Sequence, residues 1–367
     1  MRAAATTSPR YVTRPSLTRA GLVLGGGGVL LLVTLLAAVA VGSVGVGPGD
    51  TAAILGRRLL ALPIPETWSP AAETIIFELR LPRVLTAMLV GGGLAMAGTV
   101  FQALLRNPMA DPYIIGTAAG ASLGAIIGIL APVLMPALAL GAGTAWLGLG
   151  MVQALAFAGG IGTVLLVYAV ARGNGRVPVV TLLLTGYAVS SVLAAGVALL
   201  MFVSGRALGA IFGWLMGSLA GATWQGLAFA VPLMAISFAL LLVRWRRLNL
   251  LLLGDDQAGH LGVAVEREKL VLTMLATLAT SAAVAISGTI GFVGLVVPHL
   301  LRLATGPDHR LLLPASIVYG AALLALADLG ARLAGGIPVG IVTALLGAPF
   351  FIWLLRRSRD LSRVATA

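Results

Sequence analysis

The chain has 367 residues, of which 59% are hydrophobic and only 10% are charged. This composition excludes an ordinary soluble domain and predicts an integral membrane protein, because apolar segments of about 20 residues, long enough to span a bilayer as helices, recur along it. The net charge of +12 would suggest nucleic acid for a soluble protein, but here the arginines lie in short loops between apolar segments, so the expected partner is a lipid bilayer and no nucleic acid.

Residues 1–20 carry four arginines and precede an apolar stretch from about 21 to 47. A cleaved signal peptide is the competing interpretation, but both the apolar stretch and the leader before it are too long for a typical one. We therefore expect a cytoplasmic N-terminal segment, 1–20, followed by a first transmembrane helix.

About ten transmembrane helices are predicted, and they form one transmembrane domain over residues 21–357 with no soluble domain beside it. The apolar segments do not alternate in polarity, which excludes the strands of a barrel. Residues 358–367 follow as a cytoplasmic tail, and 204–225 is a candidate for a short helix that does not span. The predicted spans are 21–46, 82–104, 113–131, 146–170, 180–203, 226–247, 268–287, 290–304, 311–331 and 338–355.

An N-terminus in the cytoplasm places 18 of the 24 basic residues on the inner side and 6 on the outer side. Positive residues favour the cytoplasmic loops of membrane proteins. The bias supports an even number of spans in the cell (inner, or cytoplasmic) membrane, with both termini in the cytoplasm.

Arg80 and Arg83 are exceptions to this bias, because they flank Pro82 at the outer mouth of the second span. Pro82 suits the first turn of a helix, but that helix end carries positive partial charge and disfavours cations. Neither the topology nor the helix dipole explains two arginines here.

Small residues recur at a spacing of four in the third span, which predicts close approach of helix backbones in lipid. Gly91, Ala95 and Gly98 do something similar in the second span. The residues of the ladder are Gly116, Gly120, Gly124 and Gly128.

The sequence lacks the GxxxxGK[ST] phosphate loop, so it shows no ATP site of its own. Gradient-driven transporters usually place acidic residues inside the membrane, and Asp328, near the outer end of its span, is the main acidic residue of this kind. Arg332 follows four residues later and can pair with it on one helix face. A secondary transporter or exporter independent of ATP is therefore the disfavoured alternative.

An intramembrane serine protease is a remote alternative. Ser122 lies at the centre of a GxSxG pattern, but the two glycines belong to the packing ladder. His260 and His309 fall in predicted cytoplasmic loops, and His299 lies near the cytoplasmic end of its span. Three scattered histidines and no cysteine do not make a ligand set, so we predict no metal site and no catalytic residue.

The cytoplasmic loop at about 250–267 has the features of a short capped helix. Gly254 interrupts the incoming helix, Asp255 or Asp256 can cap a new one, and Gly262 can end it. Such a helix is a candidate docking element for a cytoplasmic partner, although an ordinary solvated loop fits these features equally well.

Four stretches of the chain, in order over roughly residues 70 to 357, resemble the FecCD-type permeases, the membrane subunits of binding-protein-dependent ABC importers for iron-siderophores, haem and vitamin B12. These stretches are RLPRVLTAMLVGGGLAMAGTVFQALLRNPMADPYIIGTAAGASLGA, LGDDQAGHLGV, GTIGFVGLVVPHLLRLATGPDHRLLLP and IPVGIVTALLGAPFFIWLL.

The resemblance implies an all-α fold like that of the vitamin B12 importer permeases, with ten helices per subunit and a substrate path between the two copies of a homodimer. It also implies two ATP-binding cassette subunits on the cytoplasmic side and an extracytoplasmic substrate-binding protein outside. ATP is then bound and hydrolysed by the partner, so the permease is not an enzyme, needs no cofactor and works by alternating access.

In the family, the arginines that match Arg80, Arg83 and Arg332 face acidic residues of the binding protein, and such charge pairs steer and orient an encounter. The alternative is that these arginines reach lipid headgroups or, for Arg332, pair only with Asp328.

The loop at 250–267 resembles the family's coupling segment, and Asn107 and Met109 match positions of its cytoplasmic gate. The second gate of the family corresponds to residues 179–181, which are more apolar here. No motif specifies siderophore, haem or cobalamin as substrate, and iron chelates are expected as the commonest cargo of the family. The implied contacts with the ATPase are Asp255, Asp256, Ala258, Leu261 and Gly262.

Overall fold

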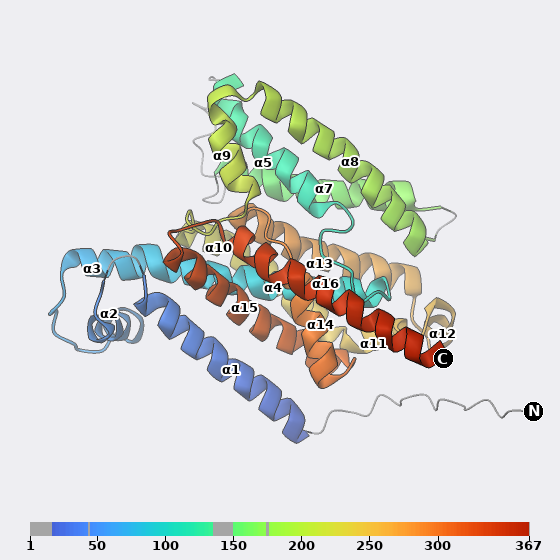
Figure 1. Ribbon diagram of the computed structural model, residues 1–367, viewed down its shortest axis with the longest axis horizontal. Coiled ribbons are helices and arrows are strands. Elements are labelled where there is room, and N and C mark those ends of the chain that lie inside the picture. Colours follow the sequence, from blue (N-terminus) through green and yellow to red (C-terminus); the bar gives the residue numbers. More distant parts are fainter. Residues whose placement is uncertain (1–16, 43–44, 135–149, 174–175, 367) are drawn as a thin grey trace, which may run out of the picture.

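The computed structural model describes residues 17–42, 45–134, 150–173 and 176–366. These residues form helices joined by short turns, and within them β-type pairing is confined to one bridge between Gly173 and Arg176. The prediction of an all-α fold is therefore confirmed (Figure 1).

Ten of the described helices occupy the ten predicted spans. Seven helices are long and apolar enough to cross a membrane, and shorter apolar helices at α5, α14 and α16 complete the set. Their bounds are α1 (Leu17–Ala40), α4 (Leu81–Leu104), α5 (Thr117–Leu134), α7 (Met151–Ala171), α8 (Val179–Val203), α10 (Trp224–Val243), α13 (Val265–Ser287), α14 (Val293–Thr305), α15 (His309–Leu333) and α16 (Val339–Thr366). The last helix runs on through residues that we expected to form a tail.

Shorter helices lie between the spans. A helix that does not span was predicted within 204–225, and it is α9 (Leu208–Leu215), preceded by the 3-10 turn η2 (Gly205–Ala207). At one end of the bundle lie α2 (Pro48–Leu60), α3 (Pro70–Thr74) and the π-helical turn η1 (Ile75–Arg80). At the other end lie α11 (Trp245–Leu251) and α12 (Asp255–His260) (Figure 1).

Helix α4 is the centre of the larger group of helices. It packs against α13, α14 and α15. In the most apolar part of the continuous helical segment Pro70–Leu104, which ends with α4, 83% of the residues are buried. Helices α5, α7, α8 and α9 form a second group along one side (Figure 1). The two groups meet mainly along α13, which packs against both α4 and α7.

Glycines let the helix backbones touch. A Cβ on Gly120 or Gly124 would collide with carbonyl oxygens of α7, and one on Gly128 would come within 2.8 Å of the Val152 Cα. These three glycines lie on one face of α5. Gly116 instead lies in the turn before α5, with a φ of +93°, so only three of the four predicted ladder residues are helical.

Candidate docking, gate and coupling sites

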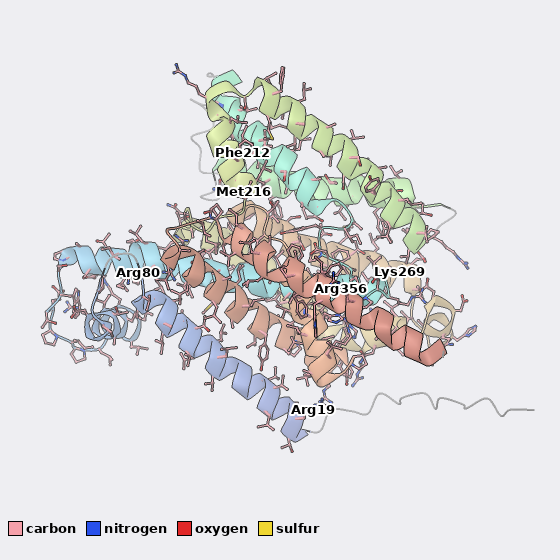
Figure 2. All side chains as sticks on the ribbon, viewed as in Figure 1. Arg19, Arg80, Phe212, Met216, Lys269 and Arg356 are labelled. Carbon is pink, nitrogen blue, oxygen red and sulfur yellow. The ribbon has the colours of Figure 1, made fainter. Side chains whose placement is uncertain are left out.

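Arg80 sits at the end of the π-helical turn η1, an element that is frequent at functional sites. Its Nη1 donates to the carbonyl oxygens of Val39, at 3.1 Å, and Ala40, at 2.8 Å. Gly42 leaves room for the guanidinium, because a Cβ there would come within 2.7 Å of the Arg80 Cζ. Arg80 is 6% exposed, so it is part of the structure at this end of the bundle (Figure 2).

Arg83 and Arg332 share one carboxylate, that of Asp328. The Arg83 Nη2 and Nε reach the two Asp328 oxygens at 2.8 Å and 3.0 Å, a bidentate pair between α4 and α15. The Arg332 Nε lies 3.2 Å from Asp328 Oδ2, as the spacing of four residues predicts. The Asp328 side chain is 1% exposed, so this ion pair is weakly screened by solvent.

The C-terminal end of α1 explains why cations gather here. Arg332 donates to the carbonyl oxygens of Ala38, at 2.8 Å, and Val41, at 3.2 Å, beside those that receive Arg80. The last carbonyls of a helix have no partner inside the helix and carry negative partial charge, which cations satisfy. Arg80, which the N-terminus of α4 disfavours, is thus stabilised by the C-terminal end of α1, and Arg83 by Asp328.

This outer arginine cluster, defined as Arg80, Arg83 and Arg332 around Asp328, borders a cavity of about 260 Å³. Three guanidinium groups and one carboxylate leave an excess of positive charge around the cavity. The segment after α9 contributes Ala220 and Ala222 to the opposite wall. A concave positive surface of this kind can receive an acidic side chain.

The turn after α4 carries the predicted gate residues. Arg106 has a left-handed φ of +48°, which reverses the chain, and the Asn107 N–H donates to Gln102 O at 3.1 Å. Asn107 Oδ1 accepts the backbone N–H of Met109 at 2.9 Å. Asn107 is exposed and Met109 is half-buried. The turn is therefore held by local hydrogen bonds.

Asp111 closes the same turn by accepting the backbone N–H of Tyr113 at 2.8 Å. Burial raises the pKa of Asp111 to about 6, and the hydrogen bond from Tyr113 opposes that rise. The charge of Asp111, in the turn that carries the gate residues, therefore changes at a pH of about 6.

The second gate region, residues 179–181, is the first turn of α8. Val180 and Thr181 are exposed and Val179 is half-buried. Val179 packs against the hydrophobic cluster that also contains Leu104 and Leu105 at the end of α4.

The coupling loop contains the predicted short helix, α12. Its N-cap is Gly254, with a φ of +110°, while Asp255 and Asp256 lie in the first turn and make no side-chain cap. Gly262, with a φ of +85°, follows the helix and ends it. The expectation of an aspartate cap was wrong, because glycine supplies the unusual backbone conformation at that position.

The predicted ATPase contacts on α12 divide into outward and inward residues. Asp256 is exposed, and Leu261 is 58% exposed. Ala258 is fully buried in the core, so its methyl group anchors α12 and does not face a partner. Asp255 forms ion pairs within the chain, with Arg106 at 3.4 Å and Lys269 at 2.5 Å.

Lys269 and Glu266 are site residues that the sequence analysis missed. Both lie in the first turns of α13, and Lys269 is 8% exposed (Figure 2). A signal was present, because Lys269 is the single lysine in a chain that otherwise uses arginine. A cavity of about 1090 Å³ lies beside α12 and is bordered by Arg106, Asp255 and Glu266.

Ser122 lies on α5 and is buried. Helix α5 packs mainly against α7, α8 and α13, whereas the three histidines belong to α12, α14 and α15. Among the described residues, no group of three potential ligands could hold a metal ion.

The comparison with protein families decides the assignment. The model of the FecCD transport family matches residues 30–357, which is most of the chain. The chain belongs to the FecCD transport family. Membership of a transport family removes the basis for the protease alternative.

Curated relatives of this FecCD-family chain are permease proteins. It is 44% identical to the cobalamin import system permease protein BtuC of Halobacterium salinarum over 80% of this chain and 75% of the relative. It is 39% identical to the hemin transport system permease protein HmuU of Yersinia pestis over 90% of this chain and 95% of the relative.

A solved structure has the same fold. It is described as an inward-facing conformation of an ABC transporter of the metal-chelate type, and it is 33% identical with a TM-score of 0.76. The match covers 91% of this chain and 99% of the other.

Proposed function

We propose that this FecCD-family chain is the membrane-spanning permease subunit of an ABC importer in the cytoplasmic membrane. A binding protein outside would deliver an iron chelate, haem or cobalamin, and a partner ATPase on the cytoplasmic side would power alternating access. The family match over residues 30–357 carries this proposal. The relatives named for cobalamin and hemin, and the solved metal-chelate type transporter, support a bulky metal chelate as cargo.

The outer arginine cluster supports docking of the binding protein at that end of the bundle. Arg83 is 18% exposed and borders the positive cavity, so it is the most accessible of the three arginines on the cluster's charged rim. Opposite charges across an interface mainly raise the rate of encounter and fix its orientation. Arg80 and Arg332 would add to the positive potential of the cavity and hold its structure, because both donate to carbonyl oxygens at the end of α1.

Helix α8 supports assembly with a second copy. Its most apolar window is only 6% buried, and Tyr187 on it is 74% exposed. Thr181, at the start of the same helix, is also exposed. Lipid alone gives polar side chains no partner, whereas a second permease and a substrate path between the copies would.

The decisive experiment is transport in sealed vesicles. The permease is reconstituted with its ATPase and the binding protein, and uptake of a ferric siderophore, hemin and cobalamin is measured separately. We expect uptake of one of them only when ATP is present on the cytoplasmic side. Uptake driven by a proton or sodium gradient without ATP would support a secondary transporter and overturn the proposal.

Docking is tested with Arg83→Gln, because the amide can still donate to Asp328 while the positive charge is lost. We expect weaker stimulation of ATP hydrolysis by the binding protein, a smaller dependence of its affinity on salt, and unchanged co-purification of the ATPase. Arg58→Gln is the matched control, because Arg58 also lies at this end but pairs with Glu73 at 2.5 Å. An unchanged salt dependence in Arg83→Gln would exclude the docking role.

A further inference from the structure

A chain of charged groups runs from α12 in two directions. Asp255, the first residue of α12, lies between Arg106 and Lys269. On the basis of the proposed function, we infer that Lys269 is a positioning residue that connects the coupling helix α12 to the second gate segment, at the start of α8, while Asp255 is paired directly with Arg106 beside the first. Movement of α12 by the ATPase would then reach the turn after α4 and the first turn of α8 together.

The first branch leads to the turn at Asn107. Arg106 Nη2 lies 3.4 Å from Asp255 Oδ1, and the Arg106 side chain also passes over Gly254, where a Cβ would be 3.4 Å from its Nη1. Arg106 immediately precedes Asn107 and holds a left-handed backbone conformation. Because a non-glycine residue is strained there, a change in the position of its side chain can change the turn itself.

The second branch leads to α8. Lys269 Nζ lies 2.5 Å from Asp255 Oδ2 and 3.5 Å from Glu266 Oε1. The other Glu266 oxygen accepts the backbone N–H of Val177 at 2.8 Å, two residues before α8 begins. The Glu266 carboxylate therefore joins the first turn of α13 to the segment that leads into α8, where the second gate region lies.

Lys269 is the group on which the branch to α8 depends. It is the cation that contacts both Asp255 and Glu266; its own side chain is 10% exposed, while those of Asp255 and Glu266 are 41% and 33% exposed. Without its charge the two carboxylates would lose their common partner. Asp255 would keep only the longer contact with Arg106, and the branch to α8 would lose its connection to α12.

A purely structural role would give a different result from a positioning role. A structural lysine would, on removal, lower stability and assembly together with transport. A positioning lysine would, on removal, leave assembly and basal ATP hydrolysis in place while the start of α8 stops following α12. Coupling between sites of this kind typically corresponds to ~5-fold to ~150-fold changes in a linked equilibrium.

The absence of cysteine from the chain makes the test direct, since a single introduced thiol has no background. Spin labels are placed one at a time at Gln257→Cys on α12, Met109→Cys at the first gate and Thr181→Cys at the start of α8. Each labelled permease is assembled with its ATPase in lipid, and the spectrum is compared with and without ATP. Each label is then combined with Lys269→Met, Lys269→Arg or the control Arg267→Met, which removes an exposed charge from the same turn.

We expect all three labels to respond to ATP in the parent chain, in Lys269→Arg and in Arg267→Met. In Lys269→Met, the labels on α12 and at Met109→Cys should still respond, because Asp255 keeps its pair with Arg106, whereas the response at Thr181→Cys should fall by about tenfold. A Thr181→Cys label that responds normally in Lys269→Met would overturn the inference and leave the proposed function intact. Failure of the parent chain to bind the ATPase, or of its α12 label to respond, would overturn the proposed function and the inference with it.

Loss of folding is detected separately by the thermal unfolding of each purified variant. If Lys269→Met does not fold, Asp255→Asn provides the second variant, because it breaks the contacts to α13 and Arg106 while keeping the side-chain shape. Normal gate responses in a folded Asp255→Asn would equally overturn the inference.

Discussion

Asp328 determines how the outer arginines are arranged. Its carboxylate is almost fully buried and receives Arg83 from α4 and Arg332 from its own helix. Two cations next to the positive end of α4 would repel each other without it. The two arginines at the start of α4, which the local sequence does not explain, are therefore accounted for by their partners on α1 and α15.

We predict that Asp328→Asn lowers the free energy of unfolding in detergent by about 3 kcal/mol, because it leaves two poorly solvated arginines without their counter-charge. Chemical denaturation measures this change. The control is Glu66→Gln, whose ion pair with Arg57 is 41% and 60% exposed and should contribute under about 1 kcal/mol. If Asp328→Asn lowered the free energy of unfolding by no more than Glu66→Gln does, the Asp328 cluster would contribute no more to stability than an exposed ion pair.

Sequence alone could reach only part of this cluster. The pairing of Asp328 with Arg332 follows from a separation of four residues on one helix. The bond from Arg83 to Asp328 joins residues that are 245 positions apart, and those from Arg80 reach carbonyls of α1. Such contacts depend on helix packing, for which the hydropathy of a span carries no information.

At the scale of elements, the spans were predictable because each one is a long apolar segment. The ends of helices were less so, since α1 ends at Ala40 and α5 begins at Thr117, several residues inside the predicted limits. Gly254 displaced the aspartates as the cap of α12, because a positive φ favours glycine more strongly than side-chain capping favours aspartate.

The contact of α5 with α7 gives a prediction with a matched control. Gly124→Ala places a methyl group against the Leu155 carbonyl and should lower the unfolding temperature and the yield of folded protein. Gly162→Ala, on α7, meets nothing within 4 Å, and alanine favours helix by about 1 kcal/mol over glycine. A thermal unfolding assay should therefore show a loss for the first variant and no loss for the second.

The turn between α4 and α5 gives a prediction for pH. Burial raises the pKa of Asp111 from 3.8 to about 6, so the folded chain holds this proton more tightly than the unfolded chain does. The contribution of the group to stability is present at low pH and is lost as the pH rises toward about 6. Relative to the parent chain, Asp111→Asn should therefore gain stability as the pH rises from about 4 to 6.

The measurement is the difference in unfolding temperature between the two proteins at a series of pH values. Taking the difference removes the contribution of the other carboxylates, which both proteins share. A difference that does not change with pH would show that Asp111 has an ordinary pKa in the folded state.

At the scale of the whole molecule, the basic residues predict which end faces the cytoplasm. The end with α12 should lie inside and the end with α2 and α3 outside. Single cysteines at Thr67 and Gln257, both exposed, test this with a thiol reagent that does not cross membranes. We expect intact cells to label Thr67→Cys and to label Gln257→Cys only after permeabilisation; the opposite pattern would invert the topology.

The glycine contacts between α5 and α7 have a mechanical consequence. At Gly124 and Gly128 the nearest atoms of α7 are backbone atoms, so no side chain at these two points could change rotamer and let one helix slide past the other. We therefore expect α5 and α7 to move together as one rigid body in any conformational change of the permease. This body would rotate about α13, which packs against both groups of helices and carries Lys269 in its first turns.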